Sequence, residues 1–134
     1  MTGGGVTFGG GEPLLQAQFI HEFFRCYPMW SVNLETSLNV LLEKMLAVVN
    51  DIDFWYVDIK DMNPEIYLRY TGKPITRVLA NLAELIRLVP ADKICVRIPL
   101  IKGYYSPVDV ERSVNALSEM GFTNIERFEY IVYR

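Results

Sequence analysis

Short apolar runs alternate with longer stretches of helical periodicity along this chain. Apolar side chains recur every fourth residue at Leu15, Phe19 and Phe23, which predicts a helix over residues 13–27 that Pro28 ends. The predicted strands are residues 6–8, 30–36, 54–60, 94–101 and 125–133, and the further predicted helices are residues 38–49, 65–70, 75–88 and 107–120.

Strands that alternate with helices are typical of parallel strands joined by right-handed crossovers. Five strands are too few to close an eight-stranded barrel. We therefore predict the α/β class: a partial (β/α) barrel of about five parallel strands with intervening helices. The 134 residues, of which 51% are hydrophobic, are expected to form a single domain.

Several strands carry polar side chains where parallel strands covered on both faces would be apolar. Glu35 lies near the end of the second predicted strand, Asp58 and Lys60 near the end of the third, and Arg97 within the fourth. A buried charge without a partner costs free energy, so these groups are expected to meet one another or a ligand. The other interpretation is that Lys60 begins a solvated loop and that Arg97 pairs with a carboxylate in the core.

The position of these charges along the strands points to one edge of the sheet. The carboxyl ends of parallel strands form the ligand crevice of α/β folds. Glu12, Glu35 and Asp58 are therefore predicted to gather on one rim with Lys60 and Arg97.

The first strand runs into the same rim through a glycine-rich segment. Glycine supplies six of the eleven residues from Gly3 to Pro13, and the second glycine triplet is followed by Glu12. Glycine permits positive φ and lets backbone groups approach a ligand closely, and Pro13 suits the first turn of a helix. A strand, a glycine loop and a helix start together predict a site for an anionic or zwitterionic small molecule.

Charge and composition exclude several classes of protein. The net charge of −3 gives no broad attraction to nucleic acid or to an anionic membrane, and no apolar stretch is long enough to span a bilayer. A soluble cytoplasmic protein is expected. Cys26 and Cys95 are predicted to be buried free thiols, and the single histidine, His21, a solvated residue rather than a ligand.

The segments around these rim residues resemble the radical S-adenosylmethionine enzymes, in particular the glycyl-radical-enzyme activating proteins such as the pyruvate formate-lyase activating enzyme. The likeness covers nearly the whole chain and includes Leu34-Glu35-Thr36, although Glu35 stands where the family usually has aspartate. The other matching segments are GGGVTFGGGEPLLQ at residues 3–16, VDIKDMN at residues 57–63 and VRIPLIKG at residues 96–103.

The resemblance implies a role for each residue of the rim. Gly10, Gly11 and Glu12 would hold the amino group of S-adenosylmethionine. Lys60 and Arg97 would contact its carboxylate or ribose, since lysine and arginine suit both. The remaining implied site is a monovalent cation at Glu35, Thr36 and Asp58.

The resemblance also implies chemistry in a longer parent protein. An electron from a donor such as flavodoxin or ferredoxin would pass through a 4Fe-4S cluster, and the resulting 5′-deoxyadenosyl radical would abstract a hydrogen atom from a glycine of a partner enzyme. The cluster needs closely spaced thiolates, and the chain has only Cys26 and Cys95. We therefore expect a fragment of such a protein, without catalytic residues of its own and inactive alone.

Two other functions remain open from the sequence. One is a nucleotide- or cofactor-binding α/β module without chemistry, since Glu35 lies about as far along as the ribose-binding acid of a dinucleotide-binding fold. The other is a non-catalytic interaction domain, in which exposed edge strands pair with another chain.

Overall fold

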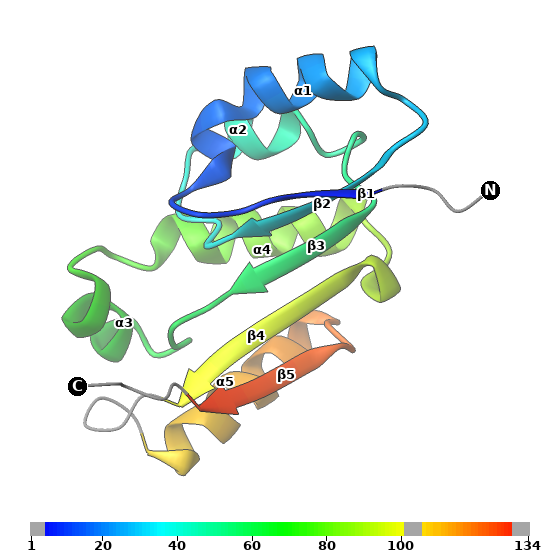
Figure 1. Ribbon diagram of the computed structural model, residues 1–134. Helices are drawn as coiled ribbons and strands as arrows, with labels where there is room; N and C mark the ends of the chain where they lie inside the picture. Colours follow the sequence, from blue (N-terminus) through cyan, green and yellow to red (C-terminus); the bar gives the residue numbers. More distant parts are fainter. Residues whose placement is uncertain (1–4, 101–105, 130–134) are drawn as a thin grey trace.

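A computed structural model describes residues 5–100 and 106–129, and the predicted strand ends at residues 101 and 130–133 lie outside the described residues. Five strands form a single parallel sheet in chain order (Figure 1). The strands are β1 (Gly5–Phe8), β2 (Ser31–Thr36), β3 (Phe54–Asp58), β4 (Ile94–Leu100) and β5 (Ile125–Glu129). The predicted fold class is confirmed, and the barrel is not closed.

The helices follow the strands in the predicted order. The α-helices are α1 (Ala17–Cys26), α2 (Leu42–Leu46), α3 (Pro64–Thr71), α4 (Thr76–Leu88) and α5 (Pro107–Met120), with short 3-10 helices η1 (Pro13–Gln16) and η2 (Ala91–Lys93). None of the helices within the described ranges is long and apolar enough to cross a membrane.

The prediction of one helix over residues 38–49 was wrong for most of its length. Residues before Leu42 form a loop, in which the Leu38 amide bonds the Thr36 hydroxyl and Leu38 has a positive φ of 58°. A side chain that bonds nearby backbone groups competes with the helical pattern. We call residues 37–41 the β2–α2 loop.

The helices cover one face of the sheet, and this arrangement explains the alternation of residue types in the strands. Val32, Leu34, Trp55 and Val57 alternate onto the covered face and join the core. The residues between them, including Glu35, Tyr56 and Asp58, are only partly buried. The charged residues Glu35 and Asp58 therefore lie on the open face, where they keep contact with solvent.

The prediction for Cys26 was wrong, and the prediction for His21 was right only in part. Cys26 is exposed, because it ends α1 on the side away from the core, whereas Cys95 is buried as predicted. His21 is not simply solvated: its Nδ1 lies 2.7 Å from Oδ2 of the buried Asp51, and the contact links α1 to the loop before β3.

The two thiols are expected to react very differently with iodoacetamide. Burial, with the charge of Glu126 next, raises the pKa of Cys95 to about 11, so that its thiol stays protonated at neutral pH. Mass spectrometry of the native chain at pH 7.5 should find alkylation at Cys26 only, and both sites should react in 8 M urea. Alkylation of Cys95 in the native chain at the rate seen in urea would contradict the buried environment.

A second buried polar group, Asp61, predicts a pH effect. Its Oδ1 accepts hydrogen bonds from the Asn63 amide at 2.7 Å and from the Ser113 hydroxyl at 3.2 Å, whereas Oδ2 is buried without a hydrogen-bond partner among the described residues. Burial raises the pKa of Asp61. The folded state therefore holds the proton more tightly than the unfolded state, and stability declines as the pH rises above the unfolded pKa of 3.8.

The variant Asp61→Asn keeps the accepting oxygen and removes the charge. We expect it to be more stable than the wild type by about 1 kcal/mol at pH 7, with the difference shrinking towards pH 4. Urea denaturation at both pH values measures this. If the gain in stability of Asp61→Asn over the wild type were smaller at pH 7 than at pH 4, the expected cost of the buried Asp61 charge would be contradicted.

Candidate functional site

The loop between β1 and η1, residues 9–12, has a backbone that glycine makes possible. Gly10 and Gly11 have φ values of 76° and 61°, a region that other residues rarely adopt, and a Cβ on either would meet no atom of the described residues within 4 Å. This glycine loop therefore presents its backbone to open space. It lines, with parts of β1, η1 and α1, a hollow of about 480 Å³, a size within the range of small-molecule sites.

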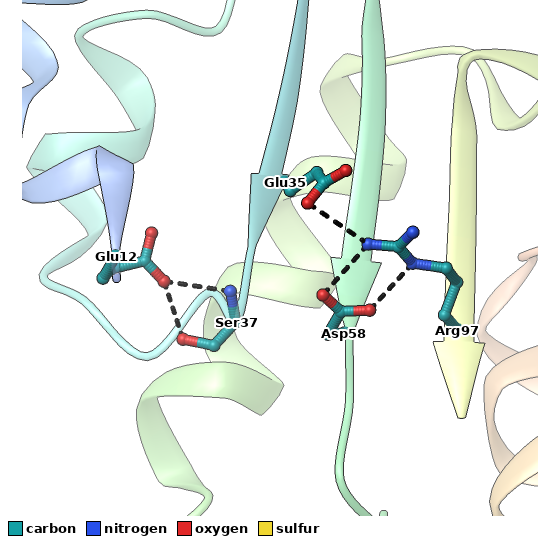
Figure 2. A network of polar contacts seen from close by, with 5 residues as sticks. All are labelled: Glu12, Glu35, Ser37, Asp58 and Arg97. Atoms are coloured by element: carbon teal, nitrogen blue, oxygen red, sulfur yellow. Dashed lines mark hydrogen bonds and ion pairs between the residues drawn. The ribbon is translucent and has the colours of Figure 1, made fainter. Parts of the chain in front are cut away.

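Glu12 closes the glycine loop with a fully engaged carboxylate. Its Oε2 accepts from the Leu14 amide at 3.1 Å and from the Thr36 hydroxyl at 2.7 Å. Its Oε1 accepts from the amide and the hydroxyl of Ser37, at 2.9 and 2.7 Å (Figure 2). Glu12 thus caps η1 and joins the glycine loop to the β2–α2 loop.

Glu35, Asp58 and Arg97 form an ion cluster on the open face, from three adjacent strands (Figure 2). The Arg97 guanidinium donates through Nε and Nη2 to the two Asp58 carboxylate oxygens at 2.8 and 3.1 Å, and Nη2 lies 3.8 Å from Glu35 Oε2. The guanidinium carbon is 5.0 Å from the centroid of the Tyr56 ring. The expectation that these charges meet one another is therefore realised.

The electrostatics of this cluster favour the ion pair. Burial lowers the pKa of Arg97, but its hydrogen bonds to Asp58 and the charges of Asp58 and Glu35 outweigh burial, and the net pKa is raised. Arg97 is thus held firmly as a cation between two carboxylates.

The ion cluster lies next to the glycine loop. A Cβ on Gly9 would come within 3.0 Å of Glu35 Oε2, so the backbone of the loop passes close to the Glu35 carboxylate. The predicted rim is therefore compact: a glycine loop with open space on one side and an acidic, arginine-bridged group on the other.

The remaining candidates lie differently. The Lys60 ammonium is 5.9 Å from the centroid of the Tyr70 ring, towards α3. Thr36 is buried and bonded to Glu12, on the opposite face of β2 from Glu35. The described residues contain no group of three or more His, Cys, Asp or Glu that could hold a metal ion. The monovalent cation at Glu35, Thr36 and Asp58 stays a prediction.

Sequence reasoning missed two polar residues that support the rim. Ser37 supplies two of the four hydrogen bonds to Glu12, and the buried Asn81 on α4 bonds the carbonyl groups of Leu38 and Val40. Asn81 could have been identified from the sequence, because it is a polar residue among the apolar positions Val78, Leu82 and Leu85 of a helix. Ser37 gave no such signal.

The chain's cysteines do not fit an iron–sulfur cluster. The cluster needs several thiolates at short range, but Cys26 is exposed at the end of α1 and Cys95 is a buried, protonated thiol on β4. The residues of this chain therefore offer a place for a small molecule and no place for the cluster.

The chain is similar in sequence to curated activating enzymes. The chain is 39% identical over 103 residues to the 4-hydroxyphenylacetate decarboxylase activating enzyme of Clostridioides difficile strain 630, a match that covers 75% of this chain and 33% of the relative. It is 37% identical over 126 residues to the (2S)-3-sulfopropanediol dehydratase activating enzyme of Klebsiella oxytoca, covering 90% and 38%. The chain thus spans about a third of the length of these relatives. No family model matches it.

Solved structures share the fold. A domain of the pyruvate-formate lyase-activating enzyme of Bacteroides vulgatus superposes with a TM-score of 0.66 at 22% identity, covering 93% of this chain and 99% of that one. Coproporphyrinogen III oxidase of Escherichia coli, a radical SAM enzyme, superposes with a TM-score of 0.67 at 16% identity, covering 95% and 32%. The resemblance in sequence and the shared fold agree: the chain is similar to one part of the activating enzymes of glycyl radical enzymes, and it has the fold of solved radical S-adenosylmethionine enzymes.

Proposed function

We propose that this chain forms the S-adenosylmethionine-binding part of an activating enzyme that generates a glycyl radical on a partner enzyme. The observation that carries the proposal is the glycine loop, with two consecutive left-handed glycines that face open space beside the ion cluster. Homology to activating enzymes supports the same role.

Each residue of the rim has its own role in binding the ligand. The Glu12 carboxylate orders the loop through its four hydrogen bonds, and the carbonyl oxygens at Gly10 and Gly11 are acceptors for the ammonium of the ligand. The Lys60 ammonium and the Arg97 guanidinium are hydrogen-bond donors for its carboxylate or ribose hydroxyl groups. Glu35 and Asp58 complete the rim on the open face, and Thr36 holds Glu12 from the covered face.

In the parent protein, S-adenosylmethionine supplies, after one-electron reduction, the radical that removes a hydrogen atom from a glycine of the partner. The electron would come through a 4Fe-4S cluster from a donor such as flavodoxin or ferredoxin. Because two cysteines cannot hold that cluster, the 134-residue chain is expected to be inactive on its own. Reductive cleavage of S-adenosylmethionine by the purified chain, after iron and sulfide have been added, would contradict this expectation.

Binding is tested with a matched pair of glycine variants. Gly10 and Gly72 both have positive φ, 76° and 73°, and in the described part of the chain no atom lies within 4 Å of an added Cβ at either residue, but Gly72 only ends α3. Alanine at either position should lower the free energy of unfolding by about 1 kcal/mol, because both backbones are strained in the same way. Only Gly10→Ala should weaken S-adenosylmethionine binding, by about tenfold in isothermal titration calorimetry.

The same titration distinguishes the proposed function from the alternative, a nucleotide-binding module. A chain that binds ATP and ignores S-adenosylmethionine would be a nucleotide-binding module, and the proposal would then fail. Equal affinities of Gly10→Ala and Gly72→Ala for S-adenosylmethionine would place the ligand away from the glycine loop and would also refute the assignment.

A further inference from the structure

The β2–α2 loop contains a strained residue. Leu38 has a φ of 58° and is the sole residue other than glycine with positive φ in the described parts of the chain, and its side chain is completely buried. A leucine in the left-handed region is an outlier that persists only where the surroundings fix it. The structure must therefore contain contacts that hold this loop in place.

Asn81 on α4 supplies two of these contacts. Its side-chain Nδ2 donates to the carbonyl oxygens of Leu38 and Val40, both at 2.8 Å, and the residue is 1% exposed. The Leu38 amide is held from the other side by the Thr36 hydroxyl at 3.0 Å. Because an unpaired carbonyl is costly in a buried place, these bonds fix the backbone on both sides of the strained residue.

Hydrogen bonds connect the β2–α2 loop to the glycine loop. The Thr36 hydroxyl that accepts from the Leu38 amide donates to Glu12 Oε2, and the neighbouring Ser37 donates twice to Glu12 Oε1. Three of the four donors to Glu12 therefore lie within two residues of Leu38. A shift of Leu38 would move the groups that orient the Glu12 carboxylate.

We propose that Asn81 is a positioning residue of the ligand site: from α4 it fixes the strained β2–α2 loop and, through Thr36 and Ser37, the Glu12 carboxylate and the glycine loop. This inference rests on the proposed function for the identity of the ligand. The hydrogen bonds from Asn81 to the loop do not depend on any ligand, so the role of Asn81 and the proposed function can be tested separately.

The variant Asn81→Leu fills a similar volume and removes both donors. Leu85→Ala is the control, since Leu85 is buried one turn later on α4 and its side chain makes none of these hydrogen bonds. In amide hydrogen exchange, Asn81→Leu should speed exchange at Ser37, Leu38 and Leu14 by about tenfold relative to Leu85→Ala. The Val96 amide in the central sheet should exchange equally in the two variants.

Ligand binding provides the second measurement. Asn81→Leu should weaken S-adenosylmethionine binding about tenfold, whereas Leu85→Ala should bind like the wild type. Combining Asn81→Leu with Glu12→Gln should cost less affinity than the sum of the two single changes, because both act on one loop. If Asn81→Leu does not fold, Asn81→Ser, which retains one donor, replaces it.

The outcomes are distinct. Unchanged exchange at Leu14 and Ser37 overturns the inference, as does faster exchange with an affinity equal to that of Leu85→Ala. A wild-type chain that does not bind S-adenosylmethionine refutes the proposed function instead, and the exchange rates at Leu14 and Ser37 still decide whether Asn81 holds Glu12 in place.

Discussion

Replacing Glu12 with alanine is expected to lower the free energy of unfolding by about 3 kcal/mol. The carboxylate accepts four hydrogen bonds, from Leu14, Thr36 and the amide and hydroxyl of Ser37. Hydrogen bonds to a charged group contribute more than neutral ones, and removal of the acceptor leaves several donors without a partner in a partly buried place. The helix cap of η1 is lost with them.

Urea denaturation at pH 7 measures this loss, with Glu22→Ala as the control. Glu22 is an exposed glutamate on α1 whose side chain accepts a hydrogen bond from Gln18, and its removal should cost about 0.3 kcal/mol. Glu12→Gln keeps one accepting oxygen and should fall between the two. If Glu12→Ala were no less stable than Glu22→Ala, the four hydrogen bonds would not hold the two loops together.

Much of the fold follows from local patterns of the sequence. The helix over Pro107–Met120 has a proline at its start, Ser106 and Asp109 in a capping box, and Gly121 in the left-handed region at its end, and the structure confirms it. The predicted helix over residues 38–49 failed because its first part is fixed by contacts from elsewhere in the chain. Asn81 and Thr36 override the helical periodicity there.

The site residues that could be predicted from the sequence are the charged residues within otherwise apolar strands. Glu35, Asp58 and Arg97 broke the expected pattern, and parallel topology brought their strands side by side. The partners of each group could not be predicted, because they depend on side-chain direction. Thr36 turns to the covered face and bonds Glu12, although its neighbour Glu35 faces Arg97.

Loss of the arginine of the ion cluster is the second large effect. Arg97→Met should keep much of the packing and leave the Asp58 and Glu35 carboxylates without their shared cation, which should lower the free energy of unfolding by about 2 kcal/mol at pH 7. The loss should be smaller in 1 M NaCl, which screens the remaining repulsion. Arg127→Met, which breaks an exposed pair with Glu111, is the control and should cost less than about 1 kcal/mol.

The double variant Arg97→Met with Asp58→Asn should recover part of the stability in urea denaturation, because one uncompensated charge is gone. A double variant as unstable as the sum of the two single ones would mean that Arg97 acts through packing alone and not as the counter-ion of Asp58.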